Sequence, residues 1–248
     1  MSTKRIFSAL AAFILTVAAF SSVPSLAFGV SDKNGESREA APARVRVPLN
    51  LAILVQDDLV SRVGNEIKVT RDFIRSLPAG SRVMVGYIRA GSLQVRQPFT
   101  TDLDKASGAL RIPAGSTAVS PYNPYVEVME ALRRFETEGA NPNALLLISD
   151  GLDVSRGFDI TSNANTIDLH RAIREAKERR VAIYSFYAPA AGLTSWNRTA
   201  VSFGQNSLNR LSNETGGRAF FQGTSFVTFD PYFRGLSRTL NERHAGAY

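Results

Sequence analysis

The sequence predicts an α/β fold, in which an open, mostly parallel, Rossmann-like sheet of six strands carries helices on both faces. Two nearly continuous apolar runs, Leu49–Val55 and Ala144–Ser149, are followed by polar and acidic residues, as is typical of central parallel strands that are buried on both sides. Between such runs lie segments whose hydrophobic residues recur at helical spacing, for example Ile167–Arg179. This alternation implies right-handed crossovers, and therefore a parallel sheet between two layers of helices.

The remaining elements follow in chain order from the same two patterns. The predicted strands are Leu49–Val55, Arg82–Arg89, Leu93–Thr100, Ala144–Ser149, Val181–Tyr187 and Ala219–Gln222. The predicted helices are Gly64–Leu77, a short helix that Asp102 caps and that ends near Leu110, Tyr125–Phe135, Ile167–Arg179, Asn206–Thr215 and Phe233–Arg243. The segment 93–100 alternates between apolar and polar residues, so we expect it at an edge of the sheet. Gly216 and Gly217 predict a helix C-cap with a positive φ.

The first 27 residues have the pattern of a secretory signal peptide. Lys4 and Arg5 precede an uncharged apolar stretch, Ile6–Phe20, and small residues at Ser25 and Ala27 suit a cleavage site. The apolar stretch is shorter than the roughly 20 residues that a membrane-spanning helix needs, which favours cleavage over an uncleaved anchor. We therefore predict Sec-dependent export to the periplasm, the cell envelope or the medium, with no transmembrane helix after cleavage.

The mature chain is predicted to be one domain behind a linker. Residues 28–45 are polar and contain Gly, Ser and Pro, which is typical of a flexible linker. After this segment, predicted strands and helices alternate along the chain, so the domain is expected to cover residues 46–248.

Composition excludes several classes of protein. The chain has no cysteine, which excludes a disulfide scaffold, a thiolate metal site and a cysteine nucleophile. It also lacks the GxSxG, GxxxxGK[ST] and GxGxxG motifs of common hydrolases and nucleotide-binding proteins. The formal charge is +7, but much of the excess lies on predicted helix faces, and an exported chain without a binding motif does not point to nucleic acid.

Three segments together resemble the von Willebrand factor A family, and in particular its diverged, exported bacterial members. They are LAILVQDDLVS, LLLISDGLD and LNRLSNETGGRAFF, whose order and spacing match the family over about residues 46–245. The resemblance implies the strand order 3-2-1-4-5-6. The strands that end at Asp57 and Asp150 would then be neighbours at the point where strand order reverses, which is where such sheets bind ligands.

The resemblance also implies a divalent-cation site at this point, although an incomplete one. The family places Asp-x-Ser-x-Ser on the first loop, Thr on the second and Asp on the third, and hard cations prefer such oxygen ligands. Asp57, Ser61 and Asp150 match this pattern, whereas Leu59 replaces the first serine and has no oxygen to offer. For the threonine position Ser120 is the first candidate, Thr117 and Asn123 are alternatives, and Asp58 and Asp153 are further candidate ligands.

Two interpretations of this site stay open at the level of sequence. One is a degenerate site that still binds a cation, with Mg²⁺ as the first candidate and Ca²⁺ as the second. The other is a site that has lost its metal, in which Asp57 and Asp150 only cap the loops at the strand ends.

Aromatic residues near the same edge suggest a surface for a protein partner. The loop Pro189–Phe203 is long, is predicted to lack regular secondary structure and carries Trp196. Tyr122 and Phe158 are expected at the rim of the same acidic surface, and Tyr125 is expected to flank the same edge. The sequence therefore predicts a non-enzymatic binding or adhesion-type domain for an unknown protein partner. The alternatives are a structural scaffold domain with a decayed metal site and, less favoured, a hydrolase that uses Asp57 and Asp150.

Overall fold

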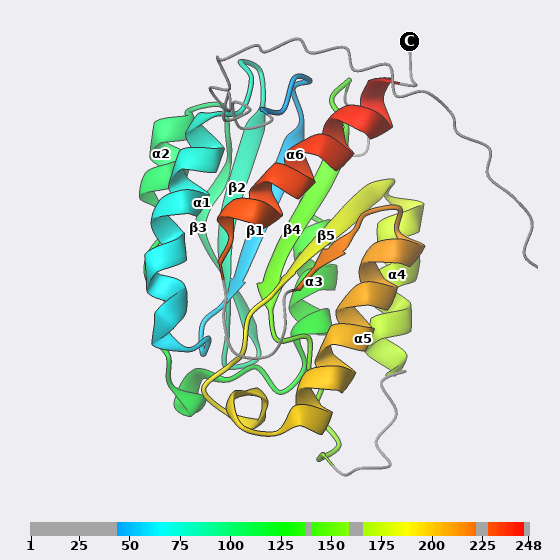
Figure 1. Cartoon of the computed structure of the whole chain (residues 1–248). Helices are drawn as coiled ribbons and strands as arrows, with labels where there is room; N and C mark the ends of the chain where they lie inside the picture. The colour runs from blue at the N-terminus through cyan, green and yellow to red at the C-terminus, as the bar shows by residue number, and fades with distance from the viewer. Residues whose placement is uncertain (1–43, 137–139, 159–165, 222–227, 246–248) are drawn as a thin grey trace, which may run out of the picture. The chain divides into compact units, whose positions relative to one another are not determined.

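The computed structural model describes residues 44–136, 140–158, 166–221 and 228–245. These residues form a six-stranded sheet in the order β3-β2-β1-β4-β5-β6 (Figure 1). The strands are β1 (Asn50–Gln56), β2 (Arg82–Arg89), β3 (Ser92–Thr100), β4 (Asn143–Ser149), β5 (Val181–Tyr187) and β6 (Ala219–Phe220). All neighbouring strands pair in parallel except β2 and β3, which form an antiparallel hairpin. The predicted fold class and strand order are confirmed.

The two edges of the sheet differ from its centre. The side chains of β3 alternate between exposed positions and positions that are partly exposed or, at Leu93, buried, and its pairing with β2 shifts register on both sides of Val85. The opposite edge strand, β6, has only two residues. Every residue of β1 and β5, by contrast, is buried. The alternating pattern of the predicted third strand thus identified an edge correctly.

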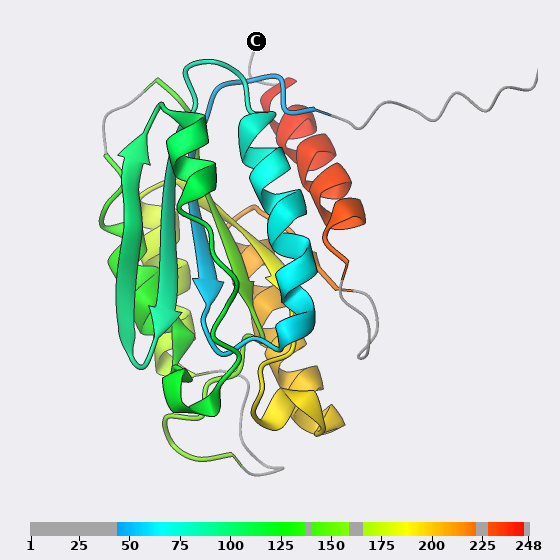
Figure 2. The same ribbon diagram turned by 90° about the vertical axis from the view of Figure 1, so that its left-hand side faces the viewer.

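Helices cover both faces of the sheet, as Figure 2 shows from the side. The helices are α1 (Glu66–Arg75), α2 (Leu103–Gly108), α3 (Pro124–Leu132), α4 (Ile167–Glu178), α5 (Arg198–Glu214) and α6 (Asp230–Ala245), with short 3-10 turns η1 (Ser61–Asn65), η2 (Thr117–Val119) and η3 (Leu193–Ser195). One hydrophobic core joins α1, α2 and α6 to one face, and a second joins α3, α4 and α5 to the other. Successive β1 residues supply the two cores in turn, because strand side chains alternate between faces.

The core on the α1 and α6 side is centred on Phe186 of β5. Its ring contacts the rings of Phe220, Phe229, Tyr232 and Phe233 at centroid separations of 4.9–5.5 Å. Aromatic pairs at such distances add to the free energy gained by burial alone. Because the chain has no cysteine, these two cores hold the fold without disulfide bonds.

The prediction for the segment after β5 needs correction. The loop 189–203 is shorter and more regular than expected, since η3 lies within it and α5 already begins at Arg198. The Asn197 side chain explains this start, because it accepts hydrogen bonds from the backbone N–H groups of Thr199 and Ala200. The predicted signal peptide, 1–27, and most of the predicted linker lie outside the described residues.

The described domain begins slightly earlier than expected. Val45, in the predicted linker, is buried in the core, and the carbonyl of Arg44 accepts a hydrogen bond from Asn241 of α6. Within the ranges that the structure describes, no helix has the length and apolar character needed to cross a membrane.

Candidate functional site

The candidate site lies where the parallel strands end, at what we call the carboxyl edge, formed by residues 57–60, 89–92, 111–123, 150–158 and 188–197. Backbone hydrogen bonds tie these segments together. The carbonyl of Asp57 accepts from Gly115 at 3.1 Å, and that of Asp58 accepts from Ala191 at 2.8 Å. Ala90 donates to Val119 at 2.9 Å, and Val154 donates to Tyr122 at 2.7 Å. The carboxyl edge is therefore a connected surface rather than a set of independent loops.

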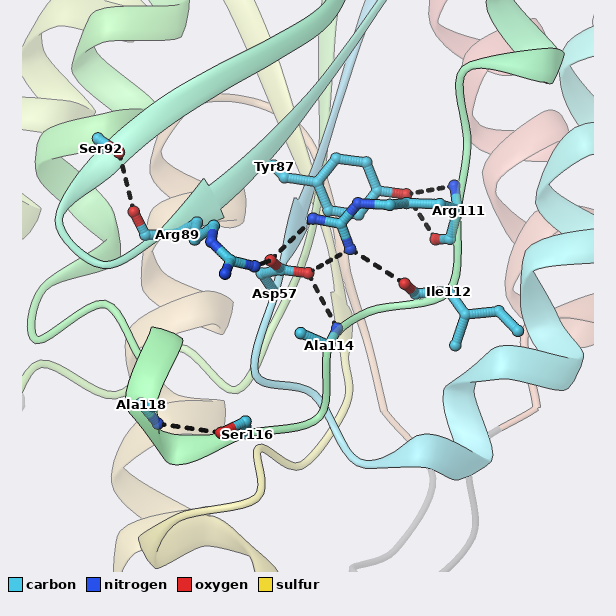
Figure 3. A network of polar contacts seen from close by, with 9 residues as sticks. All are labelled: Asp57, Tyr87, Arg89, Ser92, Arg111, Ile112, Ala114, Ser116 and Ala118. Carbon is cyan, nitrogen blue, oxygen red and sulfur yellow. Dashed lines mark hydrogen bonds and ion pairs between the residues drawn. The ribbon is translucent and has the colours of Figure 1, made fainter.

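Asp57 lies at the centre of this edge and is paired with two arginines (Figure 3). Its buried carboxylate accepts hydrogen bonds from Nη1 and Nη2 of Arg111 at 2.6 and 2.8 Å and from Nη1 of Arg89 at 2.6 Å. The backbone N–H of Ala114 adds a fourth hydrogen bond at 3.0 Å. Both carboxylate oxygens of Asp57 are thus occupied by donors from the protein itself.

Arg111 is held in place from several directions. Its guanidinium carbon lies 4.2 Å from the centre of the Tyr87 ring, and its Nη1 also donates to the carbonyl of Ile112. The Tyr87 hydroxyl donates to the Arg111 carbonyl at 2.6 Å and accepts from the Arg111 N–H at 2.7 Å. A cation over an aromatic face and a bidentate pair with a carboxylate are both favourable for arginine. These contacts therefore hold the Arg111 side chain in one position beside Asp57.

These contacts keep Asp57 ionised. Burial alone would raise the pKa of Asp57, but the hydrogen bonds from Arg111, Ala114 and Arg89, together with the charge of Arg111, hold it below its ordinary value. The Asp57 carboxylate therefore carries a full negative charge, and it is contacted by two positively charged guanidinium groups.

A second cluster joins Asp58 to Asp150 through the end of β1. The Gln56 side chain donates to Asp58 Oδ1 at 2.8 Å and accepts from the Ser149 hydroxyl at 2.5 Å. Asp150 accepts from the Thr194 hydroxyl at 2.9 Å and from the N–H of Leu152 at 3.2 Å. The five polar side chains of this cluster are all buried: Gln56, Asp58, Ser149, Asp150 and Thr194. The cluster fastens β1, β4 and the loop before α5 to one another.

The two carboxyl groups of this cluster behave differently from Asp57. Burial, reinforced by the charge of Asp58, raises the pKa of Asp150 to about 6, against hydrogen bonds from Leu152 and Thr194 that lower it. Burial also raises the pKa of Asp58, although the hydroxyl of Ser120 and the amide of Gln56 oppose the rise. Among the described residues no guanidinium group compensates this pair, which is largely withdrawn from solvent.

The residues at Asp57 do not fit a divalent cation. A cation ligated by Asp57 would lie beside two fixed guanidinium groups, whose repulsion is strong in a buried setting. Leu59, in place of the first hydroxyl, is fully buried in the hydrophobic core. Across the described ranges, no three or more His, Asp or Glu side chains are grouped so that they could share a metal ion.

The other candidate ligands have separate positions. Ser61 begins η1, and its side chain is outside the described part of the structure. The Ser120 hydroxyl lies within hydrogen-bonding reach of the carboxyl group of Asp58. Asn123 caps α3 and donates to Asp168 at 2.8 Å, and Asp153 Oδ1 accepts from the N–H and hydroxyl of Ser155. Thr117 is exposed in η2.

The three predicted partner-binding residues are all at the carboxyl edge. Trp196 is 71% exposed and Tyr122 is 70% exposed, which is unusual for aromatic side chains. Phe158 is only partly exposed, because its ring packs against Phe203 of α5 at 5.9 Å. Two of the three therefore offer most of their surface to solvent, whereas Tyr125, which was expected to flank the same edge, is fully buried and donates to the carbonyl of Gly151.

The arginine partners of Asp57 were not among the predicted site residues. Arg89 carried a usable signal, because a charged residue that ends the strand beside β1 must lie near the end of β1. Arg111 carried none, because it follows α2 and lies 54 residues from Asp57 in the sequence.

Comparisons with solved structures identify similar folds. BatB, a conserved hypothetical protein from Bacteroides thetaiotaomicron, is 9% identical, with a TM-score of 0.53 over 79% of this chain and 99% of that one. An aerotolerance-related membrane protein from Bacteroides fragilis, solved with multiple mutations to serine, is 11% identical, with a TM-score of 0.51 over 78% and 99%. The VWA domain of SpRpn10 is 14% identical, with a TM-score of 0.45 over 79% and 95%. No protein-family model and no curated protein sequence matches the chain.

At these identities the likeness concerns the fold alone. The first two structures are matched over almost their whole length, and the strand order of this chain is the one that the sequence resemblance implies. The described domain therefore has a von Willebrand factor A-like fold.

Proposed function

We propose that this chain is an exported, non-enzymatic binding domain that engages a protein partner at its carboxyl edge without a metal ion. The observation that carries the proposal is the pairing of Asp57 with Arg89 and Arg111, which fills the position of the first metal ligand with positive charge from the protein. The vWA-like fold supports a role in protein interaction, since domains of this kind are generally binding domains.

The exposed aromatic residues support the same edge as the contact surface. Tryptophan and tyrosine side chains dominate the binding energy of many interfaces, because they bury a large area with few rotatable bonds. Trp196 and Tyr122 lie on segments that are hydrogen-bonded into the carboxyl edge and therefore need little ordering on binding. The pattern of residues 1–27 supports export, and one protein of similar fold is described as a membrane protein.

The burial of the carboxyl groups, which keeps a substrate from reaching them, supports the non-enzymatic part of the proposal. Within the carboxyl edge, Asp58 and Asp150 are the carboxyl groups whose pKa values are raised, as a general acid or base would need, but they are 1% and 5% exposed. A substrate could not reach them without opening the loops that the Gln56 and Thr194 hydrogen bonds close.

Thermal unfolding in the presence of metal tests the metal-free part. Because a ligand at 100 times its dissociation constant stabilises a protein by about 2.7 kcal/mol, binding of Mg²⁺ or Ca²⁺ would raise the melting temperature by several degrees. We expect no shift up to millimolar Mg²⁺ or Ca²⁺, and no change on adding EDTA. A rise that disappears in Asp57→Asn would contradict the proposal.

Partner capture tests the surface. Cell-envelope proteins would be cross-linked to the purified domain in EDTA, with Trp196→Ala and Tyr122→Ala compared with wild type. The control is Arg96→Ala, an exposed truncation on β3, away from the carboxyl edge. We expect the aromatic variants to lose at least tenfold of the capture that the control retains. Equal capture by all variants would favour a scaffold role instead.

A further inference from the structure

The pairing of Asp57 leaves one positive charge over. A single carboxylate meets two guanidinium groups, so the ionised cluster has a net charge of +1. Asp57 itself is fully buried, whereas the side chains of Arg89 and Arg111 are 36% and 33% exposed. The surplus charge is therefore located at the surface, not in the interior.

The two arginines do not share Asp57 equally. Arg111 uses both terminal nitrogens on the carboxylate, bonds the carbonyl of Ile112 and stacks on Tyr87. Arg89 uses Nη1 alone, and within the described part of the chain its Nε and Nη2 have no acceptor. Arg111 thus neutralises Asp57, and Arg89 is the cation with donors to spare.

The backbone holds Arg89 in a fixed position. It ends β2, and its carbonyl accepts from the Ser92 hydroxyl at 2.9 Å across the hairpin turn. The next residue, Ala90, has a positive φ of 48° and donates to Val119 of η2. Because its own hydrogen bond to Asp57 also restrains the side chain, Arg89 loses little further conformational entropy on binding. Figure 3 shows Arg89 and Arg111 meeting the carboxylate of Asp57 from two sides.

The surrounding charges favour an anion. Arg62, Arg156 and Arg198 are exposed in the segments that border the carboxyl edge, and no ion pair joins any of them to another described residue. Three of the four acidic residues of the same edge, Asp57, Asp58 and Asp150, are buried, and the fourth, Asp153, is partly exposed. The edge that the sequence suggests is acidic therefore presents positive charge to a partner.

We propose that Arg89 binds a carboxylate side chain, Asp or Glu, of the protein partner through its free Nε and Nη2. The planar fork of a guanidinium group matches the two oxygens of a carboxylate, which an ammonium group cannot do. The partner surface is accordingly acidic, and attraction between it and the arginines of the edge weakens as salt is added. This inference rests on the proposed function, because it names the chemistry of the partner for the same edge.

The test uses a defined acidic probe. The probe is a tetraglutamate peptide, acetylated and amidated at its ends, and tetraglutamine blocked in the same way is its neutral match. The Nε–H resonance of Arg89 is followed by NMR on the whole mature chain. We expect saturable shifts with the glutamate peptide that disappear in 0.5 M salt, and none with the glutamine peptide. No shift of this resonance with either peptide would overturn the proposal.

Substitutions of Arg89 distinguish the contribution of its planar guanidinium group from that of its positive charge. Arg89→Lys keeps the charge but loses the fork, so the glutamate peptide should bind about tenfold more weakly, and Arg89→Gln should abolish saturable binding. Arg96→Gln, at an exposed arginine on β3, is the matched control and should bind as wild type does. If Arg89→Gln does not fold, the lysine variant still decides; equal affinity in wild type and Arg89→Lys would overturn the proposal.

Titration with a second anion distinguishes a carboxylate site from a phosphate site. Inorganic phosphate is titrated under the same conditions, and we expect weaker binding than that of the peptide. Tighter binding of phosphate would identify a phosphate site and overturn the assignment to a carboxylate. Partner capture distinguishes this failure from that of the proposed function. Loss of capture in Trp196→Ala without peptide binding at Arg89 leaves the proposed function standing alone.

Discussion

The guanidinium carbon of Arg111 lies over the ring of Tyr87, 4.2 Å from its centre, while the Tyr87 hydroxyl donates to the backbone carbonyl of Arg111 and accepts from its N–H. The segment after α2 is thereby fastened to β2, and the charged end of Arg111 reaches the buried Asp57. One arginine thus connects the interior of the sheet to the loop that carries η2.

Removal of Arg111 should destabilise the domain strongly. In Arg111→Ala the buried carboxylate of Asp57 keeps only the single bond to Arg89 and the bond to Ala114, and Tyr87 loses its cation. We expect the free energy of unfolding to fall by about 3 kcal/mol, at the low end of the range for buried pairs that lose one partner, because Arg111 is partly exposed. Urea unfolding measures it, with Arg96→Ala as the surface control. A change as small as that of the control would show that the pairing contributes little.

Arg89 should matter less for stability than Arg111. Arg89→Gln leaves the bidentate pair of Arg111 with Asp57 intact and removes a cation that is partly solvated. We expect a loss of about 1 kcal/mol or less, in line with partly exposed ion pairs. Urea unfolding of the two variants side by side gives the comparison. An equal or larger loss for Arg89→Gln would reverse the division of roles described above.

Replacing the whole pair should restore part of the lost stability. In the double variant Asp57→Leu with Arg111→Met, no buried charge is left without a partner, so the desolvation cost disappears. We expect the double variant to unfold at higher urea than Arg111→Ala. Unfolding at a lower concentration would mean that shape, rather than charge, limits what this position accepts.

Asp150 should make stability depend on pH with a definite sign. Its pKa is about 6 in the folded chain and is raised from 3.8, so the folded state binds the proton more readily than the unfolded state. The contribution of Asp150 to stability is therefore greatest below pH 4 and is lost as pH rises through 6, by about 3 kcal/mol in total. Between pH 4 and pH 7.5, the free energy of unfolding of Asp150→Asn, measured in urea, should therefore rise by about 3 kcal/mol relative to that of wild type. Parallel pH profiles for the two proteins would contradict this.

Gly204 should tolerate no side chain. A Cβ atom added there would lie 2.0 Å from the carbonyl oxygen of Asp150, so α5 would have to move away from the end of β4. We expect Gly204→Ala to lower the free energy of unfolding by about 2–4 kcal/mol. Gly108→Ala, near the end of α2 with no atom within 4 Å, is the matched control and should be neutral or slightly stabilising. A neutral Gly204→Ala would show that α5 can shift at little cost.

The fold could be predicted from the sequence because burial leaves a local pattern. The run before Gln56 and the run before Asp150 are apolar throughout, and both are central strands. Asp102 caps α2 by accepting from Lys105, and Gly216 has a φ of 78° after α5, as predicted. The start of α5 was placed too late, because the cap at Asn197 lies in a polar segment without helical periodicity.

The site could be predicted only in part, because its chemistry depends on contacts between distant residues. The positions of Asp57 and Asp150 at the ends of neighbouring strands follow from the topology. Their different surroundings do not, since Arg111 arrives from a loop 54 residues away and Thr194 from one 44 residues away. A family motif specifies only the ligands that its members share, so it does not indicate an arginine that pairs with one of those ligands.

The two outermost strands have a consequence for how the protein behaves in concentrated solution. An exposed strand offers unpaired backbone groups to a second molecule, and flat, apolar edges of this kind start aggregation. Here β3 carries Arg96 and Pro98 on exposed positions and departs from regular pairing, while β6 ends after two residues. Neither flank is therefore a good template for strand addition by a second molecule.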